Sequence, residues 1–125
     1  MSVQRWISVF LLLLVNALPV QAGNGWSTVA HPSIGAPEVI GSYAAGCIAG
    51  AAPLPLIGDG YQVMRPSRNR YYGHPRLIRF VEQLGQQVSA HGGRLLIGDL
   101  GQPRGWPMPN GHRSHQSGLD VDVWF

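Results

Sequence analysis

Residues 75–97 read PRLIRFVEQLGQQVSAHGGRLLI, and this stretch carries the strongest secondary-structure signals in the chain. Pro75 suits the first turn of a helix, and Gly92 and Gly93 are typical of a helix end. Gly85 costs about 1 kcal/mol relative to Ala inside a helix. We therefore expect a helix over Pro75–Ala90 and then a buried strand over Arg94–Ile97. The apolar residues that recur at helical spacing are Leu77, Ile78, Val81, Leu84 and Val88.

The flanking segments predict short strands. Leu119–Phe125 (LDVDVWF) alternates, which predicts a strand with Leu119, Val121, Val123 and Phe125 toward the core and the aspartates on the other face. Tyr61–Met64 is a candidate strand, and residues 23–60 form short extended pieces broken by Gly and Pro. This order predicts an α+β fold, with a small, mainly antiparallel sheet, one flanking helix and long loops.

Composition indicates one turn-rich domain. The chain has 125 residues, of which 12% are charged, with 17 Gly and 10 Pro. These values argue against a coiled coil or a charge-rich disordered tail. All nine basic residues are Arg, they are scattered, and the net charge is +3. We therefore expect no nucleic-acid partner, because such partners favour a dense basic surface.

Residues 1–22 have the pattern of a secretory signal peptide. Arg5 precedes an apolar run, and the small-residue pattern Val20-Gln21-Ala22 suits cleavage after Ala22. The run is about 15 residues even at its longest, whereas a transmembrane helix needs roughly 20. We expect an exported domain over residues 23–125 that has no membrane span after signal removal. Because the sequence stops within its clearest strand, it also looks cut short.

The chemistry-bearing residues gather in residues 111–125, GHRSHQSGLDVDVWF. Imidazole and carboxylate both suit zinc, and two ligands of one tetrahedral ion lie about 3–4 Å apart. A turn over Gln116–Gly118 would bring His115 and Asp122 together. His112 and Asp120 complete the candidate cluster. A solvated edge strand behind a polar loop is the alternative, although a carboxylate commonly supports a ligating histidine.

Cys47 is the single cysteine, and three interpretations are open. It is a buried free thiol, a partner of a cysteine outside this sequence, or a catalytic residue. The last is the least favoured, because Ala and Gly surround it and no base lies nearby in the sequence.

Four phrases of the sequence resemble a known family. His115 to Asp122 has the His-x6-Asp spacing of the zinc metallopeptidases related to lysostaphin and the D-alanyl-D-alanine metallopeptidases. The chain is more closely similar to the penicillin-insensitive murein endopeptidases, and it resembles their N-terminal part. The phrases that carry this resemblance are GSYAAGCIAGAAPLP, YQVMRPSRNRYYGHP, LLIGDLGQPRG and GHRSHQSGLDVD.

The resemblance implies a periplasmic zinc metalloendopeptidase, not a serine-type enzyme. Its substrate would be the D-alanyl–meso-diaminopimelate cross-link between peptidoglycan stem peptides. His115 and Asp122 would be zinc ligands, with His112 a further histidine at the metal and Asp120 a supporting carboxylate. Cys47 would pair with a downstream cysteine that this sequence does not contain.

The sequence also departs from the family pattern. The family completes its zinc site with a His-x-His pair far downstream, and the catalytic residues would therefore follow Phe125. We expect the 125-residue chain alone to lack peptidase activity. A non-catalytic peptidoglycan-binding or decayed fragment and a D,D-carboxypeptidase are the alternatives.

Three further residues have an expected position or role. His74 precedes Pro75 and is expected at the start of the helix. Arg65 and Arg104 are candidates for pairing with a stem-peptide carboxylate, although ordinary surface arginines are the favoured interpretation.

Overall fold

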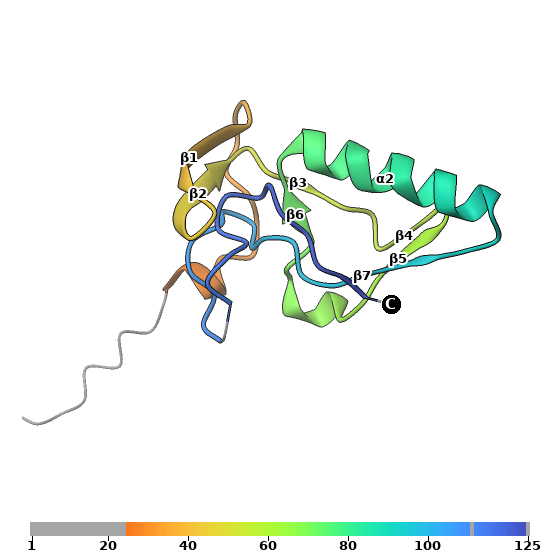
Figure 1. Ribbon diagram of the computed structural model, residues 1–125. Helices are drawn as coiled ribbons and strands as arrows, with labels where there is room; N and C mark the ends of the chain where they lie inside the picture. Colours follow the sequence, from red (N-terminus) through yellow and green to blue (C-terminus); the bar gives the residue numbers. More distant parts are fainter. Residues whose placement is uncertain (1–24, 111, 125) are drawn as a thin grey trace, which may run out of the picture.

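The computed structural model describes residues 25–110 and 112–124, so the expected signal peptide over residues 1–22 lies outside the described residues. Figure 1 shows a hairpin at one end of the molecule and a long helix at the other. No helix within the described part is long and apolar enough to cross a membrane. The elements are η1 (Gly25–Thr28), β1 (Glu38–Ser42), β2 (Ala45–Ala49), β3 (Ala52–Pro53), β4 (Ile57–Gly58), β5 (Tyr61–Val63), η2 (Pro66–Arg68), β6 (Tyr72–Gly73), α2 (Pro75–Ala90), β7 (Leu95–Ile97) and β8 (Val123–Trp124).

The helix expected from sequence is present with the expected bounds. His74 caps its start, since its Nδ1 accepts a hydrogen bond from the backbone N–H of Arg76 at 3.1 Å. This contact satisfies one of the backbone donors that a helix leaves open at its first turn. The apolar face of α2 then buries Ile78 and Val81 against the sheet.

The sheets confirm an α+β fold. The largest has four strands in the order β4-β5-β7-β8. Strands β5 and β7 are parallel, because the chain crosses between them through α2, and the other two pairings are antiparallel. Two small antiparallel pairs, β1–β2 and β3–β6, extend the molecule toward its N-terminal end (Figure 1).

The main core lies between α2 and the four-stranded sheet. A smaller cluster joins Ile48 of β2 to Ala51 and Tyr72. Burial, and then the adjacent hydroxyl of Tyr71, raise the pKa of Tyr72 to about 12, so its hydroxyl stays neutral at ordinary pH. The buried members of the main core are Leu54, Tyr61, Val63, Ile78, Val81, Ile97 and Leu100.

The strand expected over Leu119–Phe125 is shorter in the structure. Only Val123 and Trp124 form ladder pairs, and Phe125 is not among the described residues. Val121 and Val123 pack on the core as expected, but Leu119 is 53% exposed, so its placement toward the core was wrong. The physical reason is the turn before it, where Gly118 has a φ of +67° and directs the chain outward.

Gly85 has a packing role that its helix propensity conceals. A Cβ at this position would lie 2.6 Å from the carbonyl oxygen of Asp59 and 2.8 Å from Cδ1 of Tyr61. The β4–β5 turn can therefore approach α2 closely only because residue 85 has no side chain.

We expect Gly85→Ala to lower the free energy of unfolding by about 1–2 kcal/mol. The gain in helix propensity of about 1 kcal/mol is outweighed by overpacking against the hairpin. Urea unfolding measures the change, with Gln86→Ala, at an exposed position of the same helix, as the control. A stabilised Gly85→Ala protein would contradict the close approach.

Candidate metal centre

His115 lies at the centre of the candidate site. It is 2% exposed and has a φ of +65°, a left-handed conformation that is uncommon and costly for a residue with a side chain. Its backbone N–H donates a hydrogen bond to Oδ2 of Asp120 at 3.0 Å. The next residue is also held, since the backbone N–H of Gln116 donates to the carbonyl oxygen of Tyr43 at 3.2 Å. The second bond holds the backbone next to His115 against the turn of the β1–β2 hairpin.

Two carboxylates flank the His115 ring. Its Nε2 lies 3.3 Å from Oδ2 of Asp122, and its Nδ1 lies 3.0 Å from Oδ2 of Asp120. The first distance matches the separation of two ligands on one tetrahedral zinc, because each would lie about 2.0–2.2 Å from the ion. Asp120 and Asp122 both face the His115 ring, and the alternation in the sequence predicts that they share a face.

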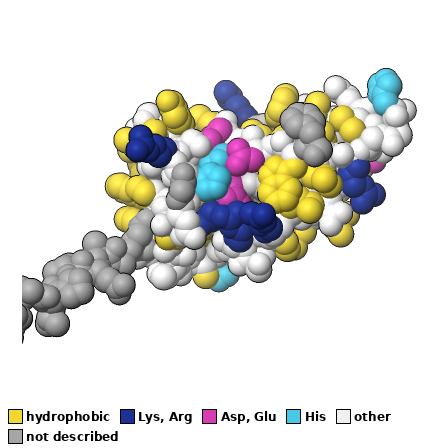
Figure 2. All heavy atoms as spheres, turned by 60° about the horizontal axis from the view of Figure 1, so that its bottom comes forward, with side chains coloured by type: hydrophobic (Ala, Val, Ile, Leu, Met, Phe, Trp, Pro, Cys, Tyr) yellow, Lys and Arg dark blue, Asp and Glu magenta, His cyan; other side chains and the backbone are white. Residues whose placement is uncertain are grey.

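His112 joins the same cluster. Its ring meets that of His115 edge to face, with 5.2 Å between the centroids. One donor atom from each of His112, His115 and Asp122 lies within 4.8 Å of the others. Figure 2 shows this face of the molecule, where histidine, acidic and arginine side chains adjoin one another. The fold therefore brings together the three residues that the sequence suggests as metal ligands.

The donor set fits a divalent metal ion. The ring Nδ1 of His115 and Oδ1 of Asp120 are buried without a hydrogen bond among the described residues, although the two side chains touch. A proton on Nδ1 would lie within reach of Oδ2 of Asp120, which is 3.0 Å away. Nε2 would then carry the lone pair on the side of Asp122, which is the arrangement of a carboxylate-supported histidine ligand. Two imidazoles and one carboxylate are also a common zinc donor set.

Asp99 is a further residue at the cluster that the sequence pattern did not indicate. This carboxylate is 6% exposed, and its Oδ2 lies 3.0 Å from Nη1 of Arg70, 3.1 Å from Nη1 of Arg68 and 3.4 Å from Nε2 of His112. The available signals were the position of Asp99 two residues after β7 and the presence of two arginines, Arg68 and Arg70, close together in an earlier segment. Only the tertiary structure places that segment beside His112.

The other candidates lie outside the cluster. Arg65 stacks over the Trp124 ring at 4.8 Å, and the exposed Arg104 donates to the carbonyl oxygen of His31 at 3.4 Å. Cys47 is a half-buried free thiol in β2 and forms an isolated β-bridge with Gly105. Trp106, in the loop beside the site, stacks on Trp26 with 4.9 Å between the ring centroids.

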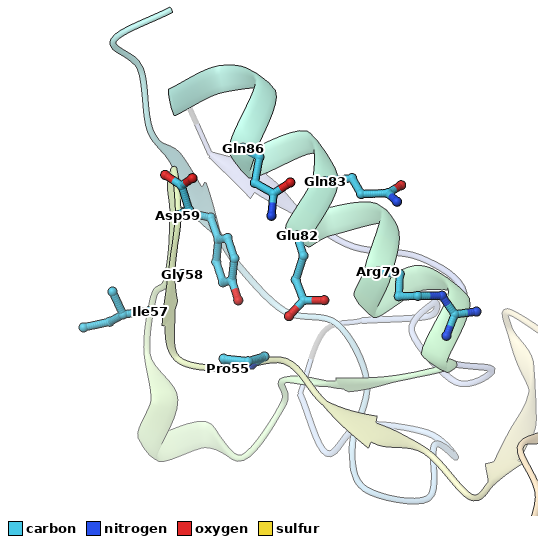
Figure 3. Close-up of a pocket in the computed structure, with 9 residues that line it drawn as sticks. Pro55, Ile57, Gly58, Asp59, Arg79, Glu82, Gln83 and Gln86 are labelled. Atoms are coloured by element: carbon cyan, nitrogen blue, oxygen red, sulfur yellow. The ribbon is translucent and has the colours of Figure 1, made fainter. Parts of the chain in front are cut away.

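Two hollows of similar size have different relations to the cluster. One of about 430 Å³ lies between the β4–β5 hairpin and α2, where Asp59, Arg79 and Glu82 line it (Figure 3), and it includes no residue of the cluster. The other, of about 420 Å³, reaches the cluster at Asp120. Its other lining residues are Val39, Gly41, Ser42, Tyr43, Ser117 and Leu119.

Fold and site together define a small α+β protein with a candidate centre for a divalent metal. Residues 39–125 match the family model described as penicillin-insensitive murein endopeptidase. The chain belongs to the penicillin-insensitive murein endopeptidase family, which confirms the resemblance found in the sequence.

Curated relatives with this name support the assignment. The protein of Yersinia enterocolitica is 46% identical over 123 residues, which is 98% of this chain and 44% of the relative. That of Pectobacterium atrosepticum is 50% identical over 126 residues, 98% of this chain and 45% of the relative. That of Salmonella newport is 49% identical over 105 residues, 83% of this chain and 38% of the relative. The chain thus spans less than half the length of these relatives.

Proposed function

We propose that the chain supplies part of a zinc-dependent peptidoglycan endopeptidase. The enzyme would cleave D-alanyl–meso-diaminopimelate cross-links in the periplasm after removal of the signal peptide over residues 1–22. The observation that carries the proposal is the convergence of His112, His115 and Asp122 donors within 4.8 Å. The family assignment supports peptide hydrolysis as the chemistry of that cluster.

Each cluster residue has a role in this proposal. His115 and Asp122 would hold zinc through Nε2 and Oδ2, the pair separated by 3.3 Å. His112 would be the third donor, which meets the three protein ligands typical of a catalytic zinc site. Asp120 would accept a hydrogen bond from Nδ1–H of His115 and fix the orientation of the ring. We assign no general base among the described residues.

The chemistry that zinc supplies when bound is polarisation of a carbonyl and activation of water near neutral pH. The protein contributes a fixed position for the buried His115 ring, at the edge of a partly exposed cluster. Burial of His115 and the backbone hydrogen bond to Asp120 hold the imidazole in place without reorganisation. The hollow beside Asp120 is open to solvent at Tyr43 and Leu119, which are 64% and 53% exposed, and it leaves room for a peptide at the cluster.

Replacing Asp122 by Asn tests the proposal. In the full gene product, we expect this change to lower the cleavage rate of cross-linked muropeptide dimers by about 100-fold or more, because a neutral amide replaces a charged ligand. Chromatography of the digestion products measures the rate. Asp59→Asn, at an exposed carboxylate outside the cluster, is the matched control and should leave the rate unchanged. Chelation should abolish cleavage, and added zinc should restore it.

Other results would redirect the proposal. An unchanged rate in the Asp122→Asn protein would exclude Asp122 as a ligand. Release of D-alanine from pentapeptide stems without cleavage of dimers would identify a D,D-carboxypeptidase. Retention on purified sacculi without any hydrolysis would identify a binding protein.

A further inference from the structure

We propose, on the basis of the zinc site above, that Asp99 is a positioning residue for His112. Its carboxylate would accept a hydrogen bond from Nε2–H of that imidazole. The lone pair would then lie on Nδ1, and Nδ1 would be the ligating atom. The buried Asp99 carboxylate contacts Arg68 and Arg70 as well as His112 of the cluster.

The backbone of Asp99 is tied to the ligand-bearing segment. Its carbonyl oxygen accepts a hydrogen bond from the backbone N–H of Asp122 at 2.9 Å. The backbone N–H of its neighbour Gly98 donates to the carbonyl oxygen of Asp122 at 2.7 Å. These paired bonds fix residue 99 beside residue 122 irrespective of side chains. The backbone of Asp99 is thus held directly beside that of a proposed zinc ligand.

The side chain of Asp99 faces two guanidinium groups and one imidazole. Nη1 of Arg68 also lies 3.3 Å from Oδ1, so the two arginines contact both carboxylate oxygens. Arg70 is itself 7% exposed, and the backbone N–H of Leu100 donates to its carbonyl oxygen at 2.9 Å. A buried carboxylate is costly unless it is paired, and the contacts with Arg68 and Arg70 hold the Asp99 side chain in place.

The contact with His112 determines which ring nitrogen faces the carboxylate. An ionised carboxylate only accepts hydrogen bonds, so Nε2 of His112, 3.4 Å away, is favoured as the protonated nitrogen. In a neutral imidazole the other nitrogen is then the available donor to a metal. A carboxylate that fixes the tautomer of a metal-ligating histidine typically changes metal affinity by 10- to 100-fold.

The tautomer of His112 tests the proposal without zinc. In the zinc-free, ¹⁵N-labelled full gene product, long-range ¹H–¹⁵N correlation should show the His112 proton on Nε2. Asp99→Asn should reduce that preference and weaken zinc affinity by about 10- to 100-fold in competition with a chromogenic chelator. The wild-type spectrum decides the tautomer even where the variant does not fold.

Control variants separate positioning from general stability. Ile97→Val, in the same strand region, should lower the midpoint of thermal unfolding and leave the tautomer and the zinc affinity unchanged. A proton on Nδ1 of His112 in the wild-type protein would overturn the proposal, as would a folded Asp99→Asn protein with unchanged tautomer and zinc affinity. Absence of zinc binding in the wild type, with the tautomer as expected, would contradict the proposed function but leave the Asp99–His112 contact standing.

Discussion

Replacing His115 by Asn is expected to weaken zinc binding by more than about 100-fold, beyond the loss that supporting residues typically cause. His115 is the buried centre of the cluster, and its ring contacts both Asp120 and Asp122. Asn is the preferred replacement because it removes the imidazole yet tolerates the φ of +65° at this position. Chelator competition measures the affinity, and zinc-dependent cleavage of muropeptide dimers measures the consequence.

The matched control is His91→Asn at the exposed end of α2. That histidine bonds the carbonyl oxygen of Gln87 through Nδ1 at 2.9 Å and lies outside the cluster. It should therefore leave zinc affinity unchanged. Zinc binding of wild-type strength in a folded His115→Asn protein would show that the metal centre is built from other residues.

Replacing Gly105 by Ala is expected to lower the free energy of unfolding by about 3 kcal/mol or more. Gly105 has a φ of +69°, which strains any residue with a Cβ. Its added Cβ would also collide with the carbonyl oxygen of Gln116 and lie 3.0 Å from Cα of Cys47. Both contacts are with backbone atoms, so relief would require the β1–β2 hairpin and the His115 loop to separate.

Gly92→Ala isolates the conformational part of this effect. Gly92 has a similar φ of +76°, but no atom lies within 4 Å of its added Cβ. It should lose only the conformational contribution of about 1 kcal/mol. Urea unfolding of both proteins gives the difference, and zinc affinity should fall in the Gly105 variant alone. Equal stability of the two variants would show that the hairpin and the site loop do not pack as closely as described.

Local sequence determined the elements that depend on neighbouring residues. Pro75, the apolar periodicity and the two glycines after Ala90 define α2, because capping and helical spacing act within a few turns. The sequence also indicated His112, His115 and Asp122 as one cluster, since the turn at Gly118 brings close residues that are only ten positions apart.

Contacts between distant segments were decided by the tertiary structure. The alternation of residues 119–125 predicted a full strand, but hydrogen bonding to Gly98 and Asp99 and the outward turn at Gly118 leave only Val123 and Trp124 in the ladder. Gly85 is unfavourable for its helix alone and required by a hairpin some 25 positions away.

Asp99 shows the same difference between local and long-range determinants at the candidate metal centre. Local sequence shows a carboxylate after a strand and, separately, a loop with two arginines. Neither pattern predicts that the carboxylate and the arginines lie close together. Their meeting with His112 depends on the parallel pairing of β5 with β7, two strands that the whole of α2 separates in the sequence. The candidate ligand residues were therefore indicated by the local sequence. The charge environment that holds His112 was fixed by long-range packing, because burial and pairing of a carboxylate are properties of the folded chain.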